Sequence, residues 1–176
     1  MSSITFNIKP IYVILGKCCS GKDTTAREME SKHNINFIIS ITTRPMRAGE
    51  SDGNPYHFIT NEEFERKISN DDLIEYREYI RDGSKWYYGV QKKDIEDDKC
   101  YVAVLDIVGL REFRKKFGNR VVPTYIDVPE EERKRRCIER GDYDEKEWGL
   151  RKQSDNAMFA EEVIKEIGHV IYWNDL

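Results

Sequence analysis

The sequence predicts an α/β fold with a central parallel sheet that is covered by helices on both faces. Short apolar runs rich in β-branched residues, such as 11–15 and 101–106, alternate with stretches of helical periodicity. Continuous apolar runs suit strands buried on both faces, and their alternation with helices predicts right-handed β-α-β units. Residues 56–80 show antiparallel signals instead, so we expect them to form a small mixed insertion on this core.

The first half of the chain contains a local signal for each predicted element. Thr60 and Glu63 have the spacing of a capping box, which predicts a helix at 61–69. Residues 73–80 alternate apolar and charged side chains, as a half-buried antiparallel strand does. The other predictions are a buried strand at 11–15, a glycine loop, a helix at 24–33, a strand at 37–40, a loop at 42–55, an edge strand at 56–59 and a turn at Asp82-Gly83.

The second half continues the alternation of strands and helices. An amphipathic stretch that ends at Gly118 predicts a helix, and Pro129 followed by three acidic residues starts another. We further expect strands at 101–106, 121–128 and 169–173, and a single last helix near 151–166. A chain of 176 residues without internal repeats suits one domain.

Composition narrows the classes of function. The formal net charge of −4 argues against a protein that coats nucleic acid. No apolar run approaches the roughly 20 residues of a membrane span, and residues 1–10 lack the apolar core of a secretory signal. The four cysteines have no zinc-site spacing, so we expect reduced thiols and a cytoplasmic protein. Nucleic acid and membrane are not expected partners, and the sequence leaves a monomer or a homodimer open.

The stretch from Gly16 to Lys22 has the spacing of a phosphate-binding loop between a predicted strand and a predicted helix. Its glycines let backbone N–H groups point into a concavity, and Lys22 adds a full positive charge for the β- and γ-phosphates. Asp23 stands where a hydroxyl residue is usual, and Thr24 follows, so we expect Thr24 to reach the α-phosphate. A glycine-rich turn without a ligand is the alternative.

The segment from Ser40 to Phe58, with its Thr-Thr-Arg-Pro-Met-Arg core, carries the strongest functional signal. Together with the phosphate-binding loop, this segment resembles the guanylate kinases. The match continues in order over nearly the whole chain, through Glu75, Tyr88-Gly89, Leu105-Asp106, Arg136, Arg140, Arg151 and Asn174-Asp175.

The resemblance implies a P-loop nucleoside monophosphate kinase with a three-layer α/β/α core at 1–36, 91–128 and 156–176. It also implies a nucleotide-monophosphate-binding insertion at 37–90 and a helical lid at 129–155. Such an enzyme uses ATP as co-substrate and GMP or dGMP as acceptor.

Chemistry assigns roles to the residues of the acceptor site. Arg44 and Arg47 can fork onto a phosphate, and Tyr56 and Tyr88 can each donate a phenolic hydrogen bond to it. The Glu75 carboxylate can accept from N1–H and N2–H₂ of guanine, a donor pair that adenine lacks, and Ser40 can donate to guanine O6. The resemblance implies a GMP site formed by Ser40, Arg44, Arg47, Tyr56, Glu75, Tyr88 and Asp106.

No general base is needed, because the attacking atom is an ionised phosphate oxygen, so catalysis reduces to positioning and charge neutralisation. The expected catalytic residues are Lys22, Arg44, Arg136, Arg140 and Arg151. The resemblance implies an ATP site formed by Gly16, Ser20, Gly21, Lys22, Asp23, Thr24, Arg140 and Asn174. Mg²⁺ is expected to bind mostly through phosphates and water, with weak contributions from Thr24 and Asp106.

Several residues depart from the family pattern or have a purely structural interpretation. Val90 and Val108 stand where hydrogen-bonding side chains are usual, which puts base choice in doubt. From alternation alone, Glu75 would face solvent. Arg133, with its neighbours Lys134 and Arg135, is expected on a solvated helix face and receives no role.

Two other functions remain open. Ribose 1,5-bisphosphate phosphokinases share this fold and similar Gly-Lys-Asp and Tyr-Gly-Val pieces, although a base-free substrate would not require Glu75. Guanylate-kinase-like modules that bind phosphopeptides without catalysis typically lack the lysine that Lys22 provides. A GTPase is disfavoured because no water-positioning switch region is visible.

Overall fold

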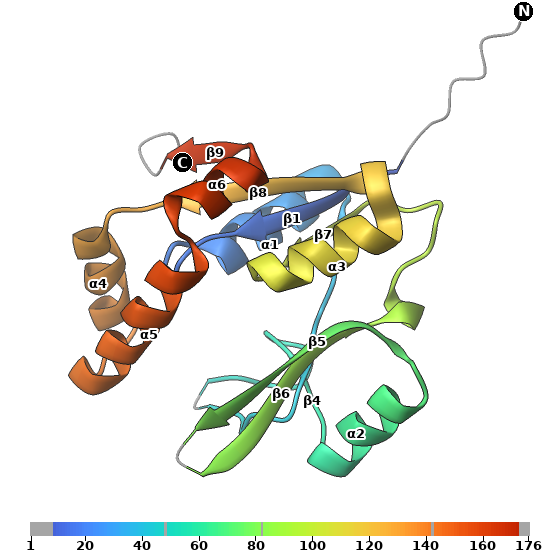
Figure 1. The fold of residues 1–176 in the computed structure, drawn as a ribbon, viewed down its shortest axis with the longest axis horizontal. Coiled ribbons are helices and arrows are strands. Elements are labelled where there is room, and N and C mark those ends of the chain that lie inside the picture. Colours follow the sequence, from blue (N-terminus) through green and yellow to red (C-terminus); the bar gives the residue numbers. More distant parts are fainter. Residues whose placement is uncertain (1–8, 48, 82, 142, 173–176) are drawn as a thin grey trace, which may run out of the picture.

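Five parallel strands form the central sheet of the computed structural model, which describes residues 9–47, 49–81, 83–141 and 143–172 (Figure 1). The strands lie in the order β2-β7-β1-β8-β9, and all four neighbouring pairs are parallel. Their bounds are β1 Ile11–Leu15, β2 Asn36–Phe37, β7 Tyr101–Val104, β8 Val121–Asp127 and β9 Val170–Tyr172. The predicted α/β class with a central parallel sheet is confirmed.

Side chains of β1 alternate between the two faces of this sheet. Ile11, Val13 and Leu15 pack in a core formed with helices α3 (Ile107–Phe117) and α6 (Glu161–Ile167). Ile14 packs on the other face against Ala26 of α1 (Lys22–His33). Both faces of the sheet are covered at β1, which explains why its sequence is a continuous apolar run. Each fully buried aliphatic side chain contributes about 1.5–3 kcal/mol to stability.

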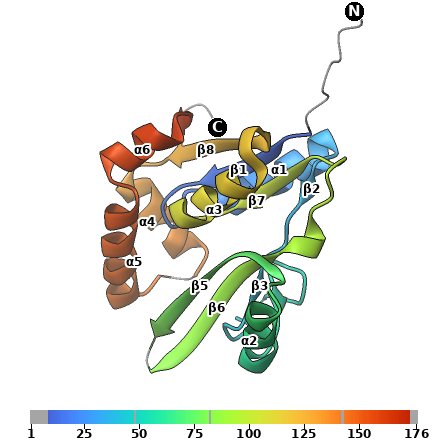
Figure 2. The ribbon, with the colours of Figure 1, turned by 45° about the vertical axis from the view of Figure 1, so that its right-hand side comes forward.

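A second, mixed sheet lies below the parallel sheet in Figures 1 and 2, with helix α2 (Asn61–Ser69) beside it. Its described strands follow the order β4-β3-β6-β5, with bounds β3 Ile41–Thr42, β4 His57–Phe58, β5 Leu73–Arg81 and β6 Ser84–Gln91. The predicted capping box is present, because Thr60 and Glu63 each bond the other's backbone N–H. The fully buried Phe64 of α2 stacks on Tyr87 at 4.8 Å, which fixes the helix on the sheet.

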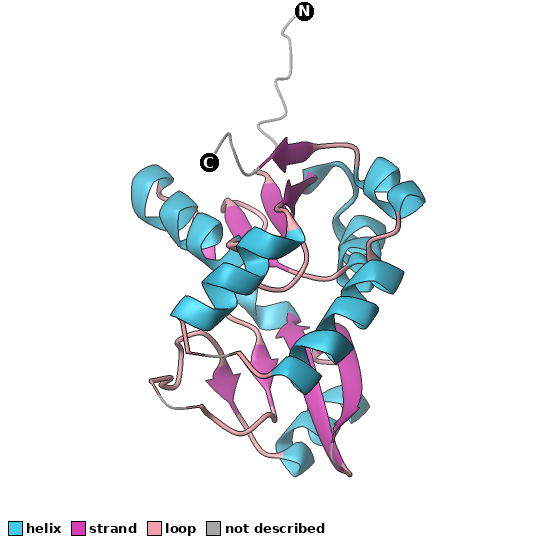
Figure 3. Cartoon of the chain, turned by 90° about the vertical axis from the view of Figure 1, so that its left-hand side faces the viewer, coloured by secondary structure: helices cyan, strands magenta, loops and turns pink. Residues whose placement is uncertain are grey.

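Helices α4 (Glu130–Glu139) and α5 (Glu145–Met158) stand together at the left-hand side of Figure 1, which is the side that faces the viewer in Figure 3. Two short 3₁₀ turns, η1 Lys92–Asp94 and η2 Gly118–Arg120, complete the described elements. No helix in the described part of the chain is both long and apolar enough to cross a membrane.

Two predicted elements are wrong. The single helix expected near 151–166 is interrupted at Phe159, which is buried and packs on Tyr125 at 5.2 Å, so the chain forms α5 and α6 instead. The strand expected at 37–40 pairs only at Asn36–Phe37, and the chain then crosses to the second sheet at Ile41. Three predicted positions, Asp82 of the turn, Trp173 of the last strand and Asn174 of the ATP site, lie outside the described residues.

Candidate active site

A cavity of about 630 Å³ lies between the carboxyl ends of the parallel strands, the second sheet and helix α5. Residues from all three regions line it, so a bound molecule would contact the phosphate-binding loop and the second sheet at once. The cavity brings together many of the residues predicted from sequence, namely Gly16, Lys22, Ser40, Arg47, Tyr56, Glu75, Tyr88, Asp106 and Arg151.

The phosphate-binding loop is tightly curled between β1 and α1. A Cβ atom at Gly16 would lie 2.6 Å from Ser20 Oγ and 2.8 Å from the Ile126 carbonyl oxygen, so only glycine fits there. Lys22 Nζ donates to the Lys17 carbonyl at 2.8 Å, which places its charge over the loop, and burial lowers its pKa. Ser20 Oγ is buried and has no hydrogen-bond partner within the described structure. A phosphate oxygen would give this hydroxyl a partner.

Sequence reasoning missed an acidic side chain at this loop. Asp155 of α5 accepts a hydrogen bond from the Cys18 backbone N–H through Oδ2 at 2.7 Å, and nearby Lys17 Nζ donates to Asn156 Oδ1 at 2.8 Å. The loop therefore binds a carboxylate through its backbone, as an anion-binding loop does. Asp155 lies 137 positions after Cys18, so local sequence spacing gave no signal for this contact.

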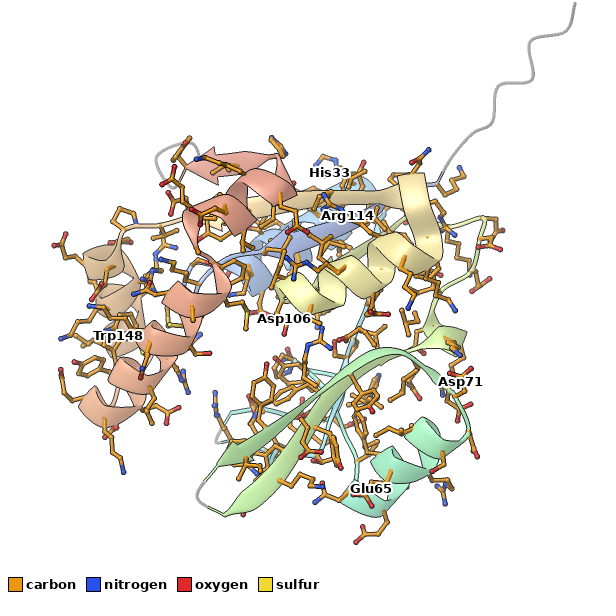
Figure 4. All side chains as sticks on the ribbon, in the orientation of Figure 1. His33, Glu65, Asp71, Asp106, Arg114 and Trp148 are labelled. Atoms are coloured by element: carbon orange, nitrogen blue, oxygen red, sulfur yellow. The ribbon has the colours of Figure 1, made fainter. Side chains whose placement is uncertain are left out.

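The predicted solvent-facing position of Arg133 is wrong. Its side chain is buried, donates to the Val128 carbonyl at 3.1 Å and the Cys18 carbonyl at 3.3 Å, and lies 5.6 Å from the ring of Trp148. Trp148 belongs to α5 and is labelled in Figure 4 where α5 lies beside α4. Arg133 thus joins the phosphate-binding loop to both helices, which a charged helix sequence does not reveal.

The next two residues of α4 behave as predicted. Lys134 and Arg135 are at least 41% exposed and form surface ion pairs, which contribute little to stability.

The two loop arginines of the predicted phosphate site differ in their surroundings. Arg44 is 4% exposed and forks onto Glu50 at 2.8 and 2.9 Å, and its guanidinium lies 5.5 Å from the ring centre of Tyr56. This pairing lowers the pKa of Glu50. Arg47 lines the cavity, while its backbone N–H donates to Glu50 at 2.7 Å. Glu50 therefore orders the loop that carries both arginines, a role that the sequence analysis did not assign.

The aromatic residues of the predicted phosphate site are in contact. The rings of Tyr56 and Tyr88 pack edge to face with centres 5.5 Å apart, and both residues line the cavity. Tyr56 comes from the loop before β4 and Tyr88 from β6, so their meeting depends on the second sheet.

A β-bulge directs Glu75 into the cavity. Leu73 pairs with Gln91, but Glu75 already pairs with Val90, so the register shifts between them and the chain bends. Glu75 is 9% exposed, and the solvent-facing position inferred from alternation is wrong. Burial raises the pKa of Glu75 to about 7, opposed by Arg77 and reinforced by Asp106. Val90 is fully buried and packs in the main core.

Asp106 begins helix α3 and faces β5 (Figure 4). Its Oδ1 accepts from the Gly109 backbone N–H at 2.7 Å, which caps the helix. Arg77 of β5 also donates to this carboxylate, from Nε to Oδ2 and from Nη2 to Oδ1, both at 3.1 Å. Sequence reasoning assigned no role to Arg77, although its position two residues after Glu75 on a strand places both on one face.

The three predicted catalytic arginines of the α4–α5 region are only partly brought together. Arg136 donates to the Ser20 carbonyl at 3.2 Å and to Glu132 at 2.8 Å. Arg140 Nη2 lies 3.6 Å from Cys19 Sγ. Arg151 lines the main cavity and also a neighbouring hollow of about 410 Å³ that Arg47 shares.

The loop cysteine Cys19 has an unusual environment. Its φ is +58°, in the left-handed region. A hydrogen bond from Cys18 and the positive charge of Arg140 lower its pKa to about 6, against the effect of burial. Cys19 lies three residues before α1, and a lowered pKa favours its thiolate form at neutral pH.

Two residues predicted for ATP or metal binding lie on the surface. Asp23 and Thr24 are exposed on the first turn of α1 and are not among the cavity-lining residues. Gly21, just before them, has a φ of +94° and lets the chain enter the helix without a side chain in the way.

The fold and the cavity define a class of protein. A glycine-rich loop between a parallel strand and a helix faces arginine and tyrosine side chains of an inserted sheet, which is an arrangement typical of P-loop proteins. The family model described as guanylate kinase matches residues 8–176. The chain belongs to the guanylate kinase family.

Individual relatives support this assignment. Guanylate kinase of Clostridium perfringens (strain 13 / Type A) is 37% identical over 136 residues, which cover 74% of this chain and 61% of that protein. Guanylate kinase of Fusobacterium nucleatum subsp. nucleatum is 31% identical over 170 residues, which cover 94% of this chain and 89% of that protein. The match thus spans less than two thirds of the first relative and most of the second.

A solved structure has the same fold. The crystal structure of guanylate kinase from Anaplasma phagocytophilum superposes with a TM-score of 0.65 and 28% identity. The superposition covers 96% of this chain and 78% of the other.

Proposed function

We propose that the protein transfers a phosphoryl group from ATP to GMP or dGMP, giving ADP and GDP or dGDP. The observation that carries this proposal is the single cavity that Lys22 shares with Arg47, Tyr56, Glu75 and Tyr88. One cavity of this kind suits a transfer between two bound anions better than hydrolysis or the binding of one ligand.

The reaction follows from positioning and charge. The γ-phosphoryl of ATP would lie near Lys22, and an ionised phosphate oxygen of the acceptor would attack it in line. Arg47 and the phenolic groups of Tyr56 and Tyr88 would hold the acceptor phosphate, and Arg44 would join them from its place beside Tyr56. Closure of the lid over the bound nucleotides would exclude water from the cavity, which would strengthen each of these interactions.

The nucleoside triphosphate side rests on the phosphate-binding loop. Backbone N–H groups between Gly16 and Lys22, with the buried Ser20 hydroxyl, would surround the β-phosphate. Asp155 would give up its hydrogen bond with Cys18 when a phosphate takes the same N–H.

Mg²⁺ fits this site mainly through the ligand. No group of three or more His, Cys, Asp or Glu side chains within the described residues could hold a metal ion. Both carboxylate oxygens of Asp106 accept hydrogen bonds, which leaves Asp106 little capacity for a cation. Mg²⁺ bound to phosphate oxygens and water, with Thr24 nearby, would neutralise charge between the β- and γ-phosphates.

We place the lid at residues 129–155 and the acceptor-binding insertion at 37–90. Arg136, Arg140 and Arg151 belong to this lid, and its closure would bring them onto the transferring group. The Arg151 side chain already reaches the hollow that it shares with Arg47 of the insertion. We also propose a cytoplasmic location; both a monomer and a homodimer are compatible with the site.

A coupled assay of ADP release tests the proposal. The acceptors are GMP, dGMP, AMP, UMP, CMP and ribose 1,5-bisphosphate, each with ATP and Mg²⁺. We expect turnover with GMP and dGMP, and a Lys22→Met variant should lower kcat/KM about 100-fold or more, because charge-assisted contacts contribute about 3 kcal/mol.

Lys32→Met provides the control, because Lys32 is 64% exposed at the far end of α1. Turnover with ribose 1,5-bisphosphate and with none of the nucleotides would show that the acceptor is the ribose compound and not GMP. Phosphopeptide binding without any turnover would instead identify a non-catalytic module.

A further inference from the structure

Arg77 occupies a central place in the acceptor pocket. It lies on the cavity face of the β5–β6 hairpin together with Glu75, Tyr79, Trp86 and Tyr88. Its side chain is only 19% exposed, between two carboxylates. Burying a guanidinium here costs desolvation energy, which its interactions in the folded protein or with a ligand must offset.

The contacts of Arg77 divide its guanidinium into two edges. Nε and Nη2 form the fork onto Asp106, at 3.1 Å each. Nη1 donates to the Tyr76 carbonyl and lies 3.5 Å from Glu75 Oε2, which is too long for a good hydrogen bond. Nη1 and Nη2 each carry a second N–H that these three hydrogen bonds do not use. Arg77 therefore brings further donors beside the two Glu75 oxygens.

This order of groups matches one edge of guanine. Along that edge guanine offers the O6 acceptor, then the N1–H donor, then the N2–H₂ donor. A donor from Arg77 followed by two Glu75 oxygens is the complementary order. Adenine offers an N6–H₂ donor and an N1 acceptor instead, so both positions would face a like partner.

We propose that Arg77 is a specificity-determining residue, which donates to O6 of a 6-oxopurine while Glu75 accepts from N1–H and N2–H₂. The inference rests on the proposed acceptor site and names a residue that reads the base there. Val90 packs in the core and offers no hydrogen bond, so Arg77 supplies a donor to the base from the neighbouring strand.

Asp106 holds Arg77 in this orientation. Asp106 is itself fixed by the Gly109 N–H at the start of α3, so helix and strand position the guanidinium before the base arrives. Asp106 is then a positioning residue for Arg77.

The nucleotide IMP distinguishes the contribution of Arg77 to base binding from that of Glu75. Hypoxanthine keeps O6 and N1–H but lacks the 2-amino group. Loss of Arg77 should therefore weaken GMP and IMP equally, whereas Glu75→Gln should weaken GMP more than IMP. If Arg77 only supported the fold, its loss would leave the GMP-to-AMP affinity ratio unchanged. It would also not weaken the binding of GMP and IMP relative to that of AMP.

The experiment measures affinity for GMP, IMP and AMP by calorimetry without ATP, and kcat and KM with ATP. Arg77→Met should lower GMP and IMP affinity about 10- to 100-fold each, as expected for a lost charge-assisted hydrogen bond. The GMP-to-AMP affinity ratio should fall by a similar factor, and Arg77→Lys should recover part of it. Lys85→Met, which removes an exposed cation of β6 at 44% exposure, is the matched control.

Unchanged GMP affinity and an unchanged GMP-to-AMP ratio in Arg77→Met, with melting temperature lowered or not, would overturn the inference. Failure of the wild-type protein to bind GMP and IMP would overturn it as well. Wild-type binding that depends on Arg77 but without phosphoryl transfer would support the inference and refute the proposed reaction.

Discussion

Glu75→Gln should change the pH dependence of stability as well as the use of guanine. Burial raises the pKa of the Glu75 carboxyl from 4.5 to about 7 in the folded protein. The folded state therefore holds this proton more tightly than the unfolded chain does. The stability that the protonated group contributes is fully present below pH 4.5 and is lost as pH rises to about 7.

The size of this loss follows from the shift. Because one pKa unit corresponds to about 1.4 kcal/mol, the ionised Glu75 costs about 3 kcal/mol of unfolding free energy at high pH. A glutamine side chain at this position would keep the shape without the buried charge. The stability gain of the variant over the wild type should therefore be larger at pH 8.5 than at pH 5, by about 2 to 3 kcal/mol.

Urea unfolding followed by tryptophan fluorescence at both pH values measures this difference. Glu78→Gln on the same strand is the control, because Glu78 is 43% exposed and its neutralisation should have a small effect. A Glu75→Gln variant whose stability gain is the same at both pH values, or that is less stable at pH 8.5, would refute the burial argument. The same variant should lose GMP activity, so the carboxylate would be retained for function against its cost in stability.

Two further predictions concern the phosphate-binding loop. Arg133→Met should destabilise the protein by about 3 kcal/mol, because buried carbonyls of Val128 and Cys18 lose their donor, whereas Arg135→Met at 57% exposure should change stability by less than about 0.5 kcal/mol. Equal effects in thermal unfolding would contradict the buried role of Arg133. Because the pKa of Cys19 is about 6, its alkylation by iodoacetamide should be nearly constant from pH 7 to 9 and slow below pH 6. Mass spectrometry measures the alkylation rate, with Cys19→Ser as the control. Bound ATP should protect Cys19 from alkylation. An alkylation rate that keeps rising to pH 9 would count against a thiolate.

The sequence by itself determined the features that depend on local spacing. The strand at Ile11–Leu15, the glycine loop that follows it and the capping box of α2 each depend on residues close together in the chain. Hydrophobic periodicity and capping act over a few residues, so a sequence pattern contains them. The alternation of strands and helices likewise indicated the parallel sheet, and the 40–58 segment indicated the family.

Only the tertiary structure decided the contacts between distant segments. Arg77 and Asp106 are 29 positions apart, and the Cys18 N–H meets Asp155 across 137 positions. Contacts between residues so far apart in the chain produce no periodic pattern in the sequence. The sequence therefore could not show that Arg133 is buried or that Phe159 divides the last helix. Burial also set the pKa of Glu75, because desolvation depends on what packs around a side chain and not on its neighbours in the chain.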